Sequence, residues 1–448
     1  MSLITGIRDR RLSEAPTRAQ SIAFGASGFP VQLMAQTFSA FVVYFYVAHL
    51  GVPAGWVAAA MIAHAILNAV LNPVVGALSD RFRTPWGRRV PWIGLGIVPL
   101  VVAFVLIWMP PVLPAGGLIA WFLIVVAVYD VAFVVVVLNV SALFPEIFRT
   151  TAERAKGNVP RQIFGILGMV LGTAIAPLLY GALGWPAMAL ILGVVCLIML
   201  AWSFRGGMIE RGGGHAGQDA VMPWRDQLRY TFANRAFVPY VLGSLMVQTS
   251  VAIIIAAIPF YVRYSLHAAE GDASVLLGAI FVAAIPSIVG WSAFVRRTSP
   301  RTAVLAGVAI FGLGTLCFLW PSNVLGAAVV GLAVGVGVGG LLQLLEIMLA
   351  QIIDDDAART GHQREGVYFG VNGFVVRGSV VLQAIVAAWV LTASGFDAGL
   401  GDAQPESVDA GIRLMLAVVP LGFTALAWLC FWLYPIRSRD LAAVSQEG

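Results

Sequence analysis

Charged residues are scarce in this chain, and their scarcity excludes a soluble domain. Only 11% of the 448 residues are charged, whereas a soluble domain carries about 25%. Hydrophobic residues make up 60% of the chain, and the mean hydropathy is +0.89. Apolar runs long enough to cross a bilayer core of about 30 Å recur along the whole length. Because these runs are unbroken and do not alternate, the sequence predicts an all-α integral membrane protein.

Cysteine is also scarce, and the motifs of several enzyme classes are missing. The three cysteines, Cys196, Cys317 and Cys430, lie inside apolar runs and suggest neither disulfides nor a metal site. No phosphate-binding loop, H-E-x-x-H or G-x-S-x-G motif occurs. Residues 335–340 fit G-x-G-x-x-G, but no strand precedes them, so they predict close helix packing. We therefore expect no enzyme, no metal and no cofactor beyond a coupling ion.

Lysine is nearly absent, since Lys156 is the only lysine among 27 basic residues. The net charge of +5 does not indicate a nucleic-acid partner, because the arginines lie at the ends of apolar runs, where membrane topology explains them. A composition rich in Arg, Ala, Gly and Val is typical of a GC-rich bacterial genome. We therefore expect a multi-pass monomer of the bacterial inner membrane, with a small-molecule substrate and the lipid bilayer as its partners.

The apolar runs predict twelve membrane-spanning helices. They are residues 21–48, 57–78, 91–109, 116–144, 160–182, 186–204, 237–262, 274–295, 302–319, 324–352, 367–391 and 412–434. Basic residues fall near the two termini and in every even-numbered loop, whereas the odd-numbered loops have almost none. The positive-inside rule then places both termini in the cytoplasm. Only Arg263, Arg377 and Arg413 fall outside this pattern.

A polar stretch in the middle of the chain divides the helices into two sets of six. It is rich in Gly, Arg and Asp and has no apolar run, which is typical of a cytoplasmic linker. The predicted parts are a tail (1–20), a six-helix bundle (21–204), the linker (205–236), a second six-helix bundle (237–434) and a tail (435–448). Two such bundles around a site at the midplane are the common plan of secondary transporters.

The loop after the second span carries the most specific motif. Residues 76–92 read GALSDRFRTPWGRRVPW between two apolar runs. Gly76 and Gly87 allow tight turns, and Asp80 suits a position beside a helix N-terminus. The spacing G-x-L-S-D-R-x(5)-G-R-R resembles the signature of the major facilitator superfamily. The following x-P-W resembles its glycoside–pentoside–hexuronide:cation symporter branch.

Two further loops carry the same resemblance. Residues 143–146, with Glu153 and Arg154, are similar to the branch's L-x-P-E…E-R element. Residues 354–370 are similar to its D-x-D-x-x-R-T-G-x-R-R-E-G-x-Y-F-G element, with Gln363 in place of one arginine. The resemblance implies a cytoplasmic ion-pair latch that holds the outward-facing state. The implied latch residues are Gly76, Asp80, Arg81, Gly87, Arg88, Arg89, Glu146, Arg154, Asp354, Asp356, Arg359, Arg364 and Glu365.

Three charged residues lie deep within the predicted spans, away from their first residues: Asp130, Arg377 and Glu346. A charge at the centre of a spanning helix costs about 2.5–3.5 kcal/mol, so each needs a partner or a function. An ion pair between Asp130 and Arg377 is the simplest account, either for substrate binding and coupling or as a structural bridge. Glu346 lies nearer the cytoplasmic end, where it takes part in coupling or pairs with a loop arginine.

A polar row in the second span completes the predicted substrate or coupling site. His64, Asn68 and Asn72 follow one another at four-residue steps, which keep them on one face of a helix. The row lines a cavity or forms interhelical hydrogen bonds. Gln32 and Gln36 of the first span add further polar groups.

The resemblance also shows where this sequence differs from the family. Its sodium-coupled members carry two aspartates where Asn68 and Asn72 stand here, so the resemblance favours H⁺ over Na⁺ as the coupling ion. Coupling through Asp130 or Glu346 and uncoupled transport both stay open. The resemblance implies secondary active transport of a sugar or glycoside by alternating access. The alternative is transport or intramembrane handling of a lysolipid, another amphipath or a pigment.

Overall fold

The computed structural model describes residues 15–81, 84, 87–208, 231–360 and 365–435, which are helical almost throughout. Twelve helical segments in these ranges are long and apolar enough to cross a membrane, which confirms the predicted number. They are Arg18–His49, Ala54–Ser79, Val90–Ile107, Ala115–Ile147, Ala152–Leu183, Trp185–Gly207, Phe237–Ser265, Glu270–Arg297, Pro300–Leu319, Val324–Thr360, Val367–Ala393 and Glu406–Trp432. The largest difference from the predicted starts is in the fifth span, which begins at Ala152 instead of residue 160.

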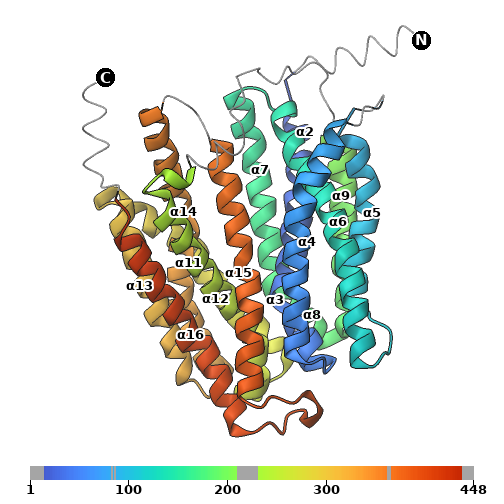
Figure 1. The fold of residues 1–448 in the computed structure, drawn as a ribbon, viewed down its shortest axis with the longest axis vertical. Coiled ribbons are helices and arrows are strands. Elements are labelled where there is room, and N and C mark those ends of the chain that lie inside the picture. The colour runs from blue at the N-terminus through green and yellow to red at the C-terminus, as the bar shows by residue number, and fades with distance from the viewer. Residues whose placement is uncertain (1–14, 82–83, 85–86, 209–230, 361–364, 436–448) are drawn as a thin grey trace. The chain divides into compact units, whose positions relative to one another are not determined.

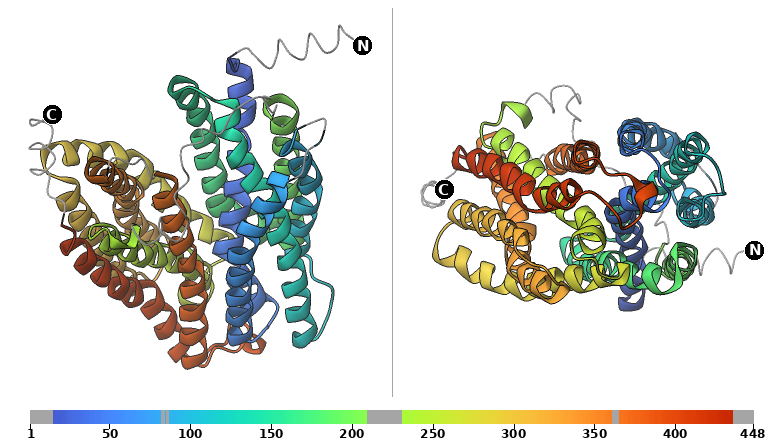
Figure 2. Two further views of the ribbon diagram at one scale, coloured as in Figure 1. Left: turned by 45° about the horizontal axis from the view of Figure 1, so that its top comes forward. Right: turned by 90° about the horizontal axis from the view of Figure 1, so that it is seen from below.

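The helices divide into two compact units. The first joins the residues up to Phe38 with those from Ile62 to the central linker, and the second joins Ser39–Met61 with the other half of the chain. The sequence places Ser39–Met61 in the first bundle, whereas its contacts group it with the second unit. The helices of each unit run along one another (Figure 1), as two further views also show (Figure 2). The cytoplasmic location of the termini stays a prediction.

In the first unit, glycines let two helices approach closely. The helices of the first six spans are α2 (Arg18–Gly25), α3 (Gly28–Tyr44), η1 (Phe45–His49), α4 (Ala54–Arg81), α5 (Val90–Ile107), α6 (Ala115–Ile147), α7 (Thr151–Val170), η2 (Leu171–Ile175), α8 (Ala176–Leu183) and α9 (Trp185–Gly207). A methyl group on Gly168 of α7 would collide with the carbonyl oxygen of Phe29 in α3. The Thr37 hydroxyl donates to the carbonyl oxygen of Gly172 at 2.9 Å. Small residues and such hydrogen bonds hold helices together where lipid supplies no hydrophobic driving force.

Glycines have the same role in the second unit. Its other helices are α11 (Phe237–Phe260), η3 (Tyr261–Ser265), η4 (Glu270–Asp272), α12 (Ala273–Arg297), α13 (Pro300–Leu316), η5 (Cys317–Leu319), α14 (Val324–Thr360), α15 (Glu365–Ala393), η6 (Ala398–Leu400) and α16 (Glu406–Trp432). A methyl group on Gly335 or Gly339 of α14 would collide with α12 backbone carbonyl groups. A Cβ on Gly337 would lie 2.6 Å from the Cβ of Phe311 in α13. The glycine run of α14 is therefore a helix-packing surface, as its sequence predicts.

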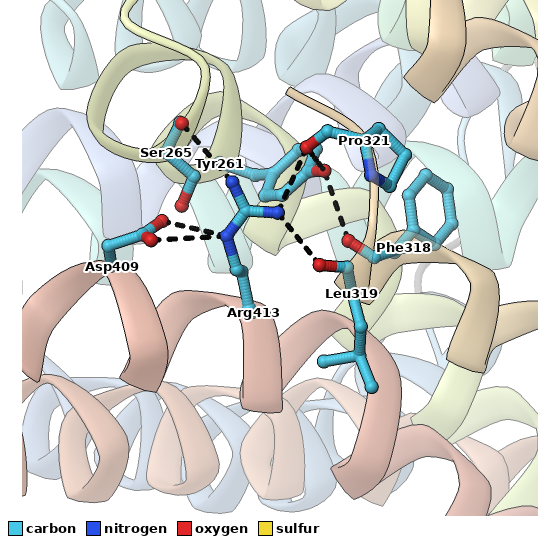
Figure 3. Close-up of polar contacts among 7 residues, drawn as sticks. All are labelled: Tyr261, Ser265, Phe318, Leu319, Pro321, Asp409 and Arg413. Carbon is cyan, nitrogen blue, oxygen red and sulfur yellow. Dashed lines mark hydrogen bonds and ion pairs between the residues drawn. The ribbon is translucent and has the colours of Figure 1, made fainter. Parts of the chain in front are cut away.

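An arginine cluster joins several segments at one end of the second unit (Figure 3). Nε of Arg413 lies 3.0 and 3.1 Å from the carboxylate oxygens of Asp409. Its Nη1 donates to the backbone carbonyl oxygens of Leu319 and Pro321 at 3.1 and 3.0 Å, and its Nη2 donates to that of Ser265 at 3.4 Å. Arg413 departs from the sequence's charge pattern because it holds the ends of η3, η5 and α16 together.

Candidate functional site

A histidine and an aspartate from different helices form a buried polar pair in the first unit. His64 lies in α4, and Asp130 lies midway along α6. Nδ1 of His64 is 2.7 Å from Oδ2 of Asp130, whose side chain is only 1% exposed. Nδ2 of Asn68 donates to the other carboxylate oxygen at 3.3 Å. Both oxygens of this buried carboxylate therefore have partners, as burial of a charge requires.

Asn72 extends the hydrogen-bonded cluster along α4, and an aromatic ring packs against His64. Nδ2 of Asn72 donates to the backbone oxygen and Oδ1 of Asn68 at 2.7 and 3.1 Å. The ring of Phe38 lies 5.2 Å from that of His64 and 5.6 Å from that of Tyr129. The row predicted from four-residue spacing thus turns toward α6. The sequence indicated His64 and Asp130 separately and did not pair them, because it does not show which helix faces meet.

The contact between Nδ1 of His64 and the carboxylate of Asp130 is a hydrogen bond when the ring is neutral and an ion pair when the ring is cationic. A neutral histidine has one protonated ring nitrogen, and the Nδ1–H tautomer donates to the carboxylate. A further proton makes the ring cationic and changes the pair from a net negative charge to a neutral ion pair.

The other two charges predicted at membrane depth lie in the second unit. Arg377 is an exposed residue of α15, and Glu346 is an exposed residue of α14. Asp130 and Arg377 belong to different compact units, so their ion pair stays a prediction. The carboxylate of Asp130 already has two donors within its own unit. The roles of Arg377 and Glu346 in coupling also stay predictions.

A polar pocket of about 280 Å³ lies between the first, fourth and fifth spans of the first unit. The polar side chains that line it are Ser27, Gln32, Ser141, Asn158, Arg161 and Gln162. Nη2 of Arg161 donates to Oγ of Ser141 at 3.3 Å, and its guanidinium carbon lies 5.7 Å from the centre of the Phe144 ring. Gln36 lies one turn beyond Gln32 on α3. A guanidinium beside several amides and hydroxyls suits a solute with hydroxyl or carboxylate groups.

Sequence reasoning grouped Gln32 with the polar row of His64, Asn68 and Asn72, none of which lines this pocket, and it missed Asn158, Arg161 and Gln162. It began the fifth span at residue 160, so Arg161 was counted among the loop cations. The helix instead begins at Thr151 and carries Arg161 about three turns inside. A capping box marks that start, since Thr150 accepts from the Glu153 backbone amide and Glu153 accepts from that of Thr150. Thr150 and Glu153 at this spacing are the sequence signal that would have placed the helix start correctly.

Part of the predicted cytoplasmic latch is assembled in the first unit. Oε1 of Glu146 accepts from Nη2 of Arg88 at 2.7 Å and from Nε of Arg89 at 2.8 Å. Gly87 has a backbone φ of 108°, a conformation that residues other than glycine rarely adopt. Oγ1 of Thr84 donates to the Gly87 carbonyl oxygen at 2.6 Å and closes this turn. The structure therefore brings three of the predicted latch residues together, and their gating role stays a prediction.

The remaining latch residues make local contacts or lie outside the described parts. Nε of Arg154 donates to the carbonyl oxygen of Phe148 at 3.2 Å and so braces its own loop. Arg359 lies 3.2 Å from Asp355, one turn earlier on α14, while Asp356 is buried and Asp354 is exposed. The prediction of a tight turn at Gly76 is wrong, because α4 continues through it and ends at Arg81, whose side chain is exposed. The side chains of Asp80 and Glu365, and all of Arg364, lie outside the described residues.

A second polar cluster joins the segment Ser39–Met61 to the rest of the second unit. The Tyr44 hydroxyl donates to Oε1 of Glu270 at 2.9 Å. The same oxygen accepts from Nη1 of Arg263 at 2.7 Å, and Nε of Arg263 donates to Oδ1 of Asp402 at 3.1 Å. Arg263, another exception to the charge pattern, thus pairs with Glu270 at the start of a spanning segment and with Asp402 between α15 and α16.

Twelve spanning helices in the described ranges, grouped in two compact units, with a buried His64–Asp130 pair and a polar pocket within one unit, are features of a polytopic membrane transporter. The sequence matches the family described as MFS/sugar transport protein over residues 23–438, so the chain belongs to that family. This confirms the resemblance to the major facilitator superfamily. The protein is therefore a multi-pass cell-membrane transporter and not an enzyme.

Individual relatives are more distant. The chain is 24% identical to the isoprimeverose transporter of Lactiplantibacillus pentosus over 96% of its length and 91% of the relative. It is also 24% identical to the sodium-dependent lysophosphatidylcholine symporter 1-A of Danio rerio, over 82% of its length and 76% of the relative. A bacterial homologue of the human lysosomal transporter Spinster, in an inward-facing and occupied conformation, matches with a TM-score of 0.71 at 13% identity, over 96% of this chain and 99% of that one. These relatives support secondary transport and the fold.

Proposed function

We propose that this protein moves a sugar or glycoside across the membrane by alternating access, coupled to protons through His64 and Asp130. The observation that carries the proposal is the 2.7 Å contact between His64 and the fully buried carboxylate of Asp130. A transporter needs a group that changes charge when the coupling ion binds. Ionisable residues within spanning segments commonly mark such proton relays. Sodium is not the proposed ion, since the amides of Asn68 and Asn72 supply no negative charge.

The polar pocket of the first unit is the proposed substrate site. Its amides and hydroxyls present both donors and acceptors to sugar hydroxyl groups. Arg161 adds a fork of N–H donors that matches a carboxylate, so a uronate or other acidic glycoside is the favoured ligand. Ligand pockets combine a few such polar groups with apolar walls, here supplied by Val31, Val137 and Val140.

Proton coupling is tested by uptake into proteoliposomes under an imposed pH gradient. Radiolabelled monosaccharides, glycosides and uronates serve as the panel. We expect Asp130→Asn and His64→Gln to abolish gradient-driven accumulation while keeping exchange of labelled for unlabelled solute, which needs no net proton movement. The matched control is His49→Gln, because His49 ends the first span and is not part of the His64–Asp130 pair. Unchanged accumulation in the Asp130 and His64 variants would contradict proton coupling at this pair.

Substrate class is tested by thermal stabilisation, because a ligand that binds the folded state raises its melting temperature. We expect uronates to stabilise the purified wild type and to lose most of this effect in Arg161→Gln, with Arg296→Gln as the control for net charge. The panel is repeated with and without sodium at two pH values. Stabilisation by neutral sugars alone, unaffected in Arg161→Gln, would contradict the role of Arg161.

A lysophospholipid is the second candidate substrate. The similarity to the lysophosphatidylcholine symporter of Danio rerio, at 24% identity, equals that to the isoprimeverose transporter. The guanidinium of Arg161 suits a phosphate as well as a carboxylate. Lysophosphatidylcholine therefore belongs in the same thermal panel. A shift with lysolipid and none with any sugar would move the assignment to this class.

A further inference from the structure

A second groove lies on the first unit, and it differs in chemistry from the polar pocket. It has a volume of about 670 Å³ and runs between the starts of the first and fifth spans. Most of its wall is apolar and comes from Ile22, Val159, Ile163 and Phe164. Val159 and Ile163 are 59% and 55% exposed, so the groove opens to the surface of the unit. No residue lines both this groove and the polar pocket, although α7 contributes to each.

Two cations lie at one end of this groove. Arg18 is the first residue of α2, and Lys156 lies in the second turn of α7; both side chains are exposed. Neither forms an ion pair with an acid in the described part of the chain. The nearest acid along α7 is Glu153, whose carboxylate is used to cap the helix by accepting from the backbone amides of Arg149 and Thr150. The two positive charges are therefore not neutralised by the described residues.

On both the first and the fifth span, a basic residue comes first along the chain and the apolar residues of the groove follow it. The first and fifth spans are both odd-numbered, so they enter the membrane from the same face. Arg18 comes one turn before Ile22, and Lys156 comes one and two turns before Val159 and Ile163. In a bilayer this order would place the cations at the level of the lipid headgroups and the apolar wall deeper, at the level of the acyl chains.

We propose that this groove holds an anionic phospholipid, with its phosphate at Arg18 and Lys156 and an acyl chain against Ile22, Val159 and Ile163. Basic pockets between spanning helices on the cytoplasmic side bind such headgroups. The positive-inside pattern places this end of the first and fifth spans on that side. The lipid occupies the outer face of α7 and so stays in place while solute passes the polar pocket on the opposite face. This inference does not depend on which solute is transported.

The test compares two lipids that share acyl chains and differ in headgroup charge. Dioleoyl phosphatidylglycerol and dioleoyl phosphatidylcholine are added to the protein in dodecyl maltoside, and binding is followed by thermal unfolding and native mass spectrometry. We expect the anionic lipid to bind on the order of tenfold more tightly, since each basic residue near a lipid surface adds measurable affinity. Soluble glycerol 3-phosphate tests whether the headgroup alone suffices, and we expect it to give no shift.

Three variants locate the effect. Arg18→Gln with Lys156→Gln removes both charges and should abolish the preference for phosphatidylglycerol, and Arg18→Lys with Lys156→Arg should retain it. Val159→Trp should weaken both lipids by filling the groove. Arg296→Gln with Arg297→Gln removes two exposed charges from the end of α12 and is the matched control. An unchanged preference in the Arg18/Lys156 double variant, an equal loss in the control, or an equal shift with glycerol 3-phosphate would each overturn the proposal.

Discussion

At the scale of single residues, the amides of Asn68 and Asn72 extend hydrogen bonds from Asp130 along α4 and add no further negative charge. Asn68 donates to Asp130 at 3.3 Å, and Asn72 in turn donates to Asn68 at 2.7 Å. An amide supplies a donor to a carboxylate and adds no charge of its own. The proposal of H⁺ as the coupling ion rests on this single carboxylate beside a histidine, since several carboxylates together would attract a metal cation.

Restoring negative charge at these positions should change the coupling ion. We expect Asn68→Asp with Asn72→Asp to make solute uptake dependent on sodium, because neighbouring carboxylates repel one another and a bound cation relieves the repulsion. In sodium-free buffer the same variant should transport more slowly than the wild type. The measurement is uptake into proteoliposomes in sodium or choline salts at equal ionic strength. Equal rates in the two salts would show that these positions do not determine ion choice.

At the scale of elements, glycine surfaces and one arginine cluster hold the helices together. Gly335 and Gly339 bring the backbone of α14 against that of α12, where a side chain of any size would collide. Arg413 satisfies carbonyl groups at the ends of neighbouring segments, and carbonyl groups left unpaired in lipid are costly. Both devices replace the hydrophobic driving force that spanning helices lack.

The glycine surface predicts a difference between two alanine substitutions. Gly339→Ala places a methyl group against the carbonyl group of Ala284 and should destabilise the protein by about 1–3 kcal/mol, the usual cost of overpacking. Gly290→Ala, in α12, meets open space and should be neutral or stabilise by up to about 1 kcal/mol through helix propensity. Thermal unfolding of the two variants in one detergent measures the difference. Similar melting temperatures would refute close packing at Gly339.

The arginine cluster predicts an order of effects between its two charged members. Arg413→Gln removes donors from three backbone carbonyl oxygens and should destabilise by about 2 kcal/mol, as expected for loss of hydrogen bonds from a charged group. Asp409→Asn removes one partner of a half-exposed ion pair, for which a smaller loss is expected. A larger drop in melting temperature for Asp409→Asn would contradict the clamp role of Arg413.

At the scale of the whole molecule, the proposed alternating access needs groups that control it, and the polar clusters at the helix ends are the candidates. Glu146 accepts from Arg88 and Arg89, and these three side chains are 20%, 40% and 13% exposed. Charge-assisted hydrogen bonds in such partly buried positions are stronger than those between neutral groups. We therefore expect loss of one such group to change the balance between conformational states.

Loss of the Glu146 charge should slow the transport cycle more than it weakens binding. We expect Glu146→Gln to lower the maximum rate by about tenfold, the effect of about 1.4 kcal/mol on a conformational equilibrium, with substrate affinity within a few-fold of wild type. Initial uptake rates at several solute concentrations separate the two quantities. Glu406→Gln, at an exposed acid in the first turn of α16, is the control. An unchanged maximum rate would exclude Glu146 from the latch.

The sequence by itself determined the number of spanning helices, the loop motifs and the polar residues of α4, because hydrophobicity and helical spacing are local properties. It misplaced the start of α7, and with it Arg161, because an amphipathic first turn is less apolar than the span that follows. Only the tertiary structure decided that His64 meets Asp130, 66 residues away along the chain. That contact depends on which face of α4 meets which face of α6. The packing of whole helices decides this, and the preferences of single residues do not.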